Sequence, residues 1–228
     1  MILRKLRLVK RSRMNIYIDY DDCLCETARY FTHLVYDMFG KKILYEDITC
    51  FDLKQSFGLT NDEYEQMMIK AHLPEELLSY KVTPGAVDAV NNWIDAGHNV
   101  SVITGRPFGV YEPSREWLDN NGLEGVSLYC LNKYGREGLF KNSKYSLEIE
   151  DYNKMHFDIA IEDSPFAFKF FNHLPDLKVM VFDRPWNRNS ELPSSIYMRC
   201  VNWKELLVFF EILFFLLVLF FYFYFSFL

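Results

Sequence analysis

The chain has 228 residues, half of them apolar, which is enough for one α/β domain with a substantial core. Its formal net charge is −6, yet residues 1–13 carry six basic side chains and no acidic one, so the remainder is clearly acidic. An acidic body excludes a general nucleic-acid-binding surface, which needs a basic face.

The two ends differ in composition from the middle. Met14 directly precedes the first predicted strand, so we interpret residues 1–13 as a basic extension that is not translated, with a targeting or membrane-surface segment as the alternative. Residues 206–228 are almost entirely apolar and just long enough for one membrane span. Membrane association through residues 206–228 and a read-through or frame-shifted end both remain open.

Apolar runs alternate with amphipathic stretches along the middle of the chain. The runs predict strands over residues 14–19, 98–104, 126–131, 157–163 and 177–183. The amphipathic stretches, several with Pro at the start or Gly at the end, predict helices over residues 26–40, 60–72, 73–80, 84–97, 113–122, 146–155, 164–174 and 202–210. This alternation predicts an α/β fold with a doubly wound (Rossmann-like) parallel sheet.

Residues 27–81 interrupt the alternation and predict a small helical cap inserted after the first strand. The catalytic core would then comprise residues 14–26 and 82–208, followed by an apolar tail at 209–228. The five cysteines are odd in number and lack the spacing of a disulfide framework or of paired CxxC motifs. We therefore predict a reducing, cytoplasmic compartment and no structural zinc.

Polar side chains follow three of the predicted strands. The first strand ends at Asp19 and Asp21, the second at Thr104, and a later one at Glu162 and Asp163. Because the carboxyl ends of parallel strands share one edge, we expect these side chains to meet.

This set of side chains fits phosphoryl transfer. A carboxylate that attacks a phosphate dianion meets a repulsion of several kcal/mol at contact, even at an effective dielectric of about 20. A divalent cation removes that repulsion, and Asp19 and Asp163 offer the oxygen ligands that Mg²⁺ prefers. Asp21 can reach past Asp19 to the leaving oxygen as a general acid, and Thr104 can hold a phosphate oxygen.

The segments DYDDCLCET, VITGRP and IAIEDS resemble motifs one, two and four of the haloacid dehalogenase superfamily of phosphatases. The later segment VFDRPWNR resembles the 5′(3′)-deoxyribonucleotidase branch and its bacterial relatives. The resemblance implies catalytic roles for Asp19 as nucleophile, Asp21 as acid/base and Thr104 as phosphate ligand. It also implies Mg²⁺ as cofactor, held by Asp19, Asp21 through its backbone carbonyl, Glu162 and Asp163.

The sequence departs from the family pattern at one place, and the lysine of motif three has to be chosen among several. Asp22 and Cys23 stand where the family usually has Gly followed by Thr or Val. The motif-three lysine, which neutralises the nucleophile and phosphate, is assigned first to Lys144 and second to Lys141. Substrate binding is assigned to Gly105, Arg106 and Arg184.

The function that follows is Mg²⁺-dependent hydrolysis of a small phosphorylated metabolite, such as a nucleotide, through an aspartyl-phosphate. A phosphomutase of the same superfamily and a membrane-tethered, non-catalytic protein of this fold remain alternatives. Asp21 disfavours a dehalogenase, and the absence of GxGxxG and GxxxxGK[ST] motifs disfavours a nicotinamide oxidoreductase and a P-loop ATPase.

Overall fold

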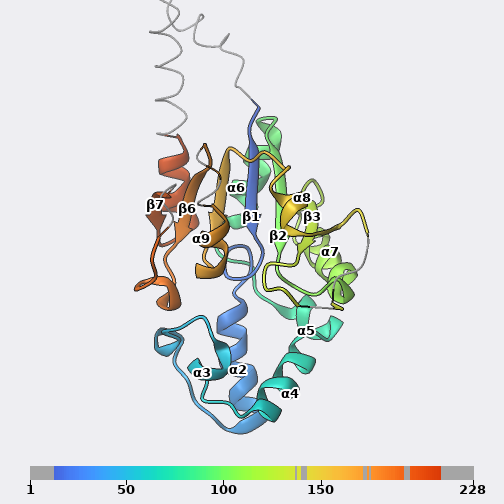
Figure 1. The fold of residues 1–228 in the computed structure, drawn as a ribbon, viewed down its shortest axis with the longest axis vertical. Coiled ribbons are helices and arrows are strands. Elements are labelled where there is room, and N and C mark those ends of the chain that lie inside the picture. The colour runs from blue at the N-terminus through green and yellow to red at the C-terminus, as the bar shows by residue number, and fades with distance from the viewer. Residues whose placement is uncertain are drawn as a thin grey trace, which may run out of the picture.

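The structure is a computed structural model that describes residues 13–136, 138–139, 143–171, 174, 176–192 and 196–211. Within these residues one sheet of seven parallel strands runs through the centre in the order β4-β3-β2-β1-β5-β6-β7 (Figure 1). The strands are β1 (Asn15–Asp19), β2 (Asn99–Thr104), β3 (Ser127–Leu131), β4 (Ser146–Leu147), β5 (Ile159–Glu162), β6 (Lys178–Phe182) and β7 (Ile196–Cys200).

The central strand β1 shows why the sheet is covered on both faces. Ile16 and Ile18 belong to one buried cluster, whereas Tyr17 belongs to the cluster on the other face. This is the period of two that a strand imposes on its side chains. A strand that is apolar on both faces needs a layer of helices on each.

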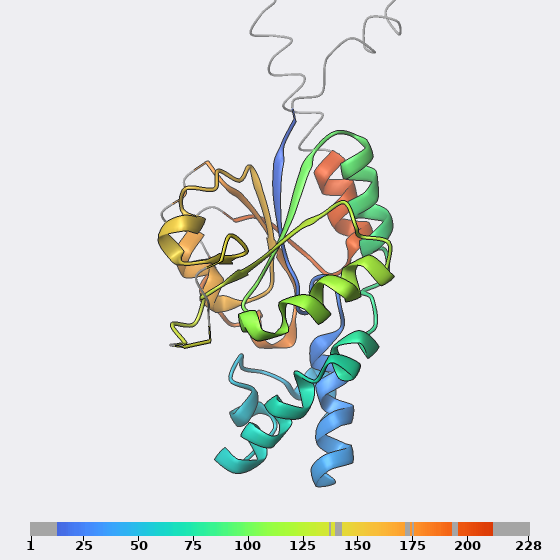
Figure 2. The same cartoon turned by 90° about the vertical axis from the view of Figure 1, so that its right-hand side faces the viewer.

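Helices supply those two layers, which the edge-on view in Figure 2 separates. On one face lie α6 (Ala86–Asp95), α7 (Tyr111–Asn120) and a helix described over residues 203–211. On the other face lie α8 (Ile149–Tyr152) and α9 (Pro165–Phe171). The predicted doubly wound parallel fold is therefore confirmed.

The segment between β1 and β2 folds into a group of helices beyond the carboxyl ends of the strands (Figure 1). The group contains α2 (Thr27–Phe39), α3 (Leu53–Ser56), α4 (Asn61–Ala71) and α5 (Pro74–Ser79). Gly40 ends α2 in the left-handed region, at φ +67°. Thr60 and Glu63 form a reciprocal capping box at the start of α4. The sequence predicted a helical cap over residues 27–81, and we refer to this group of helices as the cap.

The two chain crossings between core and cap pair with each other. Glu26 donates its backbone N–H to Lys81, and Thr83 donates its backbone N–H to Leu24. The cap is therefore attached through a short two-stranded neck directly beside the end of β1.

Two strands were not predicted. The segment assigned to a helix over 146–155 starts with β4, which pairs Ser146 with Cys130 and Leu147 with Leu131, so α8 begins only at Ile149. Strand β7 lies at the other edge of the sheet and pairs with β6. Neither edge strand has an apolar run long enough to be recognised locally.

Predictions about the two ends fall mostly outside the described residues, which exclude residues 1–12 and 212–228. Among the helices that the structure does describe, none has both the length and the hydropathy needed to cross a bilayer.

Candidate active site

The carboxyl ends of the strands form the floor of a cavity of about 500 Å³ that the cap encloses from the other side. Asp19 ends β1, and Thr104 ends β2 on the neighbouring strand. The predicted site residues that line the cavity are Asp19, Asp21, Gly105, Arg106 and Asp163. The cap contributes Phe31, Phe51, Lys54, Tyr64 and Met68 among others.

A buried lysine neutralises the carboxylate at the end of β1. Lys133 Nζ lies 2.5 Å from Asp19 Oδ1 and 3.0 Å from Glu162 Oε2. It also donates to the Tyr17 hydroxyl at 2.8 Å, and that hydroxyl in turn donates to Glu162. The Lys133 side chain is only 1% exposed, so these contacts form away from water.

The charged groups at this position shift one another's pKa values strongly. Burial opposes the charged form of Lys133, but Asp19 and Glu162 outweigh it and raise the pKa of the ammonium well above its usual value. Burial and the charge of Glu162 raise the pKa of Asp19, although Lys133 acts in the opposite direction. Burial and Glu162 likewise raise the pKa of Asp163. Further positive charge would therefore stabilise the ionised forms of both aspartates.

The donor atoms suit a hard divalent cation. Ligand atoms of Asp19, Cys23 and Asp163 lie within 4.8 Å of one another. Burial raises the pKa of the Cys23 thiol, which keeps it protonated and a poor ligand, so the two carboxylates are the effective donors. Lys133 is ion-paired with Asp19 and Glu162, and the third buried carboxylate, that of Asp163, forms no ion pair in the described part of the chain. This excess of buried negative charge is what a bound Mg²⁺ would balance.

Ser164 adds a polar side chain at the same place. It is buried next to Asp163, lines the cavity, and interacts with the Tyr134 hydroxyl, a contact that acts to lower the pKa of Tyr134. The Ser164 hydroxyl could also meet a phosphate oxygen or a water on a cation.

Asp21 is held by the residues of the β2 loop and the cap. Arg106 donates from Nη2 to Asp21 Oδ1 at 2.6 Å and from Nε to Oδ2 at 3.0 Å, while Thr27 donates its hydroxyl at 2.5 Å. Burial acts to raise the pKa of Asp21, but Arg106 and Thr27 outweigh it, and the net pKa is lowered. The ionised form of Asp21 is therefore favoured, and its carboxylate is held at the cavity by these two partners.

The unusual residue Asp22 is explained by its backbone and side chain. It adopts φ +57°, the left-handed region that Gly reaches most easily. Both carboxylate oxygens accept from the backbone N–H of Ala28, in the first turn of α2. Asp22 thus stabilises the start of the first cap helix, a contact that Gly cannot make.

The loop after β2 explains two more residues. Thr104 is fully buried, and its hydroxyl accepts the backbone N–H of Arg106 at 3.1 Å. A Cβ atom at Gly105 would lie 2.5 Å from Cε2 of Tyr134, so only glycine fits there. The chain can therefore approach the cavity closely at this point.

The sequence was compared with those of known proteins. No protein-family model matches the chain. It is 24% identical over 195 residues to a "Putative nucleotidase" of Halalkalibacterium halodurans, covering 86% of this chain and 91% of the relative. A relative of the same name from Oceanobacillus iheyensis is 21% identical over 197 residues, covering 85% and 97%.

Solved structures agree with the motif resemblance. A haloacid dehalogenase-like hydrolase from Streptococcus pneumoniae matches with a TM-score of 0.54 at 13% identity, covering 87% of this chain and 99% of its own. CbbY from Rhodobacter sphaeroides, solved with phosphate, matches with a TM-score of 0.51 at 16% identity, covering 85% and 96%. The chain has the haloacid dehalogenase fold. The family resemblance drawn from the sequence is therefore confirmed at the level of the fold.

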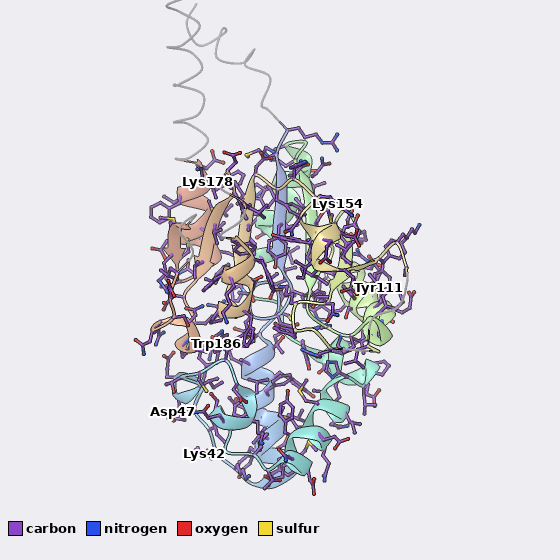
Figure 3. The ribbon with its side chains drawn as sticks, viewed as in Figure 1. Lys42, Asp47, Tyr111, Lys154, Lys178 and Trp186 are labelled. Atoms are coloured by element: carbon purple, nitrogen blue, oxygen red, sulfur yellow. The ribbon has the colours of Figure 1, made fainter. Side chains whose placement is uncertain are left out.

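Within the haloacid dehalogenase fold of this chain, the lysine beside Asp19 is Lys133, not either residue predicted from the sequence. Lys144 is exposed, with its ammonium over the ring of Tyr145 at 4.6 Å, and Lys141 lies outside the described residues. Lys154, from the same region, lies on the outer surface away from the cap (Figure 3). The overlooked signal is that Lys133 follows the apolar strand 127–131 by two residues, as Asp21 follows β1.

Two other predicted residues are engaged elsewhere. Glu162 is not part of the carboxylate pair at the cation position: its Oε2 faces Lys133, and its Oε1 accepts the backbone N–H groups of Asp163 and Ser164. Arg184 was assigned to substrate, but it donates from Nε and Nη2 to the backbone carbonyl of Asp22 at 3.0 and 2.6 Å. Both residues therefore hold other residues of the site in place: Glu162 holds Lys133, and Arg184 holds the backbone at Asp22.

Proposed function

We propose that the chain is a Mg²⁺-dependent phosphomonoester hydrolase in which Asp19 carries the phosphoryl group as an aspartyl-phosphate. The observation that supports this most strongly is the position of Asp19 at the cavity floor, paired with Lys133 and next to Asp163. A carboxylate buried against an ammonium, at the place where substrate would enter, suits a nucleophile, and a cation bound beside it would favour the ionised, reactive form.

The residues divide the reaction into two displacements. In the first, Asp19 attacks phosphorus and the bond to the ester oxygen breaks; that oxygen takes its proton from the protonated form of Asp21, which the lowered pKa makes the minor form. In the second, the Asp21 carboxylate takes a proton from a water molecule, whose oxygen attacks phosphorus and releases phosphate and free Asp19. Lys133 holds Asp19 in place and balances charge through both steps.

Mg²⁺, when held by Asp19, Asp163 and the backbone carbonyl of Asp21, would supply charge neutralisation for the phosphate. Gly105 lines the cavity beside Thr104, and the Thr104 hydroxyl, which accepts the backbone N–H of Arg106, keeps its own proton, so both residues would orient phosphate oxygens.

A nucleoside monophosphate is the substrate class that the cavity favours. Phe51 of the cap and Tyr134 and Phe166 of the core form an aromatic wall, with ring centroids 5.6 to 6.2 Å apart. Aromatic rings bind the flat face of a base with little regard to its identity. The cavity volume of about 500 Å³ also falls in the range of small-molecule sites. The names of the relatives from Halalkalibacterium and Oceanobacillus point in the same direction.

The test is phosphate release by the full-length chain with and without Mg²⁺, using nucleoside and deoxynucleoside 5′-monophosphates beside ribose 5-phosphate. The sugar phosphate is the matched control, because it keeps the ester and lacks the base. We expect kcat/KM to be at least about tenfold higher for the nucleotides, a difference of about 1.4 kcal/mol. Equal values for ribose 5-phosphate would contradict the nucleotide assignment, and no hydrolysis of any ester would contradict the enzyme.

A further inference from the structure

A turn after β6 reaches back to the cation position. Residues Pro185–Asn187 form one turn of helix, η4, and the indole N–H of Trp186 donates to Oδ2 of Asp163 at 2.8 Å. Trp186 is only 6% exposed and lines the cavity. A buried indole thus contacts one of the two carboxylates that would hold the cation.

This hydrogen bond fixes the orientation of a carboxylate. The indole N–H can only donate, so it holds Oδ2 in one direction. Oδ1 accepts a hydrogen bond from the Cys23 thiol, a weak donor, at 3.9 Å, within the cluster that includes Asp19. Oδ1 is therefore the Asp163 oxygen that is more available to a cation.

The backbone of the turn does not depend on the indole N–H. Asn187 donates from Nδ2 to the carbonyls of Asp163 and Phe182, both at 2.8 Å. These two bonds hold the turn against β5 and β6. Replacing the indole N–H should thus change the carboxylate while leaving the turn folded.

The same indole also touches the cap. Its ring meets that of Tyr45 edge to face, with centroids 5.9 Å apart. The guanidinium of Arg29, in α2, lies 4.0 Å from the centroid of the Tyr45 ring. Figure 3 shows Trp186 at the junction of core and cap. The packing of the indole against the cap further restricts how it can move.

We infer that Trp186 is a positioning residue that orients Asp163 for the divalent cation. This inference rests on the proposed function, because it requires a cation at Asp19 and Asp163. Outer-sphere hydrogen bonds to metal ligands commonly change metal affinity by about 10- to 100-fold.

The direct test is Mg²⁺ binding to the full-length chain without substrate, by calorimetry, for the wild type and Trp186→Phe. We expect the variant to bind Mg²⁺ about tenfold or more weakly. Trp117→Phe is the matched control, since Trp117 is also a buried indole that donates to a carbonyl, that of Tyr80, at 2.8 Å. The control should lose stability without a change in Mg²⁺ affinity.

The kinetic constants of Trp186→Phe provide a second test. Saturating Mg²⁺ should restore kcat in Trp186→Phe, with KM for the ester little changed, because the indole orients the ligand and does not touch the reacting atoms. A lowered kcat at saturating Mg²⁺ with unaltered Mg²⁺ affinity would overturn the inference.

Fluorine NMR keeps the inference testable even if Trp186→Phe fails to fold. The chain has four tryptophans, so fluorotryptophan labelling gives four resonances. Trp93→Phe, Trp117→Phe and Trp203→Phe assign Trp186 by elimination. Its resonance should move most on Mg²⁺ addition. A wild type that binds no Mg²⁺ would refute the proposed function, whereas Mg²⁺ binding that leaves the Trp186 resonance unmoved would refute this inference alone.

Discussion

Lys133 and Asp19 form a buried ion pair, with Nζ and Oδ1 2.5 Å apart, although 114 residues separate them in the chain. Strands β1 and β3 each pair with β2, so the pair joins the ends of two strands that are next-but-one neighbours in the sheet. The contact places the positive charge of Lys133 at the position where we propose that phosphate accumulates charge.

Replacing this lysine should cost both activity and stability. Lys133→Met keeps an unbranched side chain but leaves Asp19 and Glu162 without their cation. Breaking a buried pair in this way destabilises by roughly 3–5 kcal/mol, and losing transition-state charge stabilisation lowers kcat by about 100-fold or more. Thermal denaturation and phosphate release measure the two effects. Lys144→Met, on the surface, should match the wild type, and the reverse pattern would return the catalytic role to Lys144.

Mg²⁺ should stabilise the folded chain through Asp163. At a concentration about 100 times its Kd, a ligand that binds only the folded state adds about 2.7 kcal/mol to the free energy of unfolding. We expect the melting temperature to rise on Mg²⁺ addition and the rise to vanish in Asp163→Asn. Asp158→Asn is the control, because that carboxylate accepts the backbone N–H of Asn15 at the far end of β5. A rise that persists in Asp163→Asn would place the cation elsewhere.

Arg106 should set the pH range of activity through Asp21. Burial raises the pKa of Asp21, but Arg106 outweighs it, so Asp21 stays ionised to lower pH than an ordinary aspartate. Arg106→Gln should raise that pKa, and the limbs of the kcat profile that report Asp21 should move to higher pH, whether it acts as acid or as base. Arg106→Lys retains the charge and should move the profile less. An unmoved profile in Arg106→Gln would show that Asp21 does not control the rate.

The aromatic wall should determine the preference for a base. Phe51→Ala removes the cap ring that packs on Tyr134 and Phe166. We expect kcat/KM for nucleotides to fall about tenfold or more while that for ribose 5-phosphate stays constant, because stacking on an aromatic ring contributes about 1–3 kcal/mol per base. Tyr36→Ala, which removes an exposed ring of the same cap, should leave both values unchanged. Equal losses for both esters in Phe51→Ala would mean that the ring only supports the fold.

Much of the site could be anticipated because buried parallel strands are continuous apolar runs. The runs that end at Asp19, Thr104 and Glu162 stand out from their surroundings, and one rule about strand ends brings them together. Applied to residues 127–131, the same rule identifies Lys133. The family resemblance drew attention to the later lysines, close to a predicted helix, where distance from the nucleophile cannot be judged from sequence.

Other features depend on contacts that no local pattern records. Strand β4 has two residues, and its pairing with β3 exists only once the sheet is assembled. The hydrogen bond from Trp186 to Asp163 requires the turn after β6 to fold back over β5. Arg184 appeared available for substrate because its partner, the Asp22 carbonyl, is 162 residues away in the chain.

The central claim is that Asp19 becomes phosphorylated. The most direct measurement is acid quench of the full-length chain during turnover with a nucleoside monophosphate and Mg²⁺, followed by peptide mass spectrometry. We predict one phosphoryl group on the peptide that contains Asp19, and none in Asp19→Asn, which should remain folded but inactive because it keeps the volume and loses the nucleophile. Phosphate release by Asp19→Asn at the wild-type rate, or a phosphoryl group on a different residue, would contradict the mechanism.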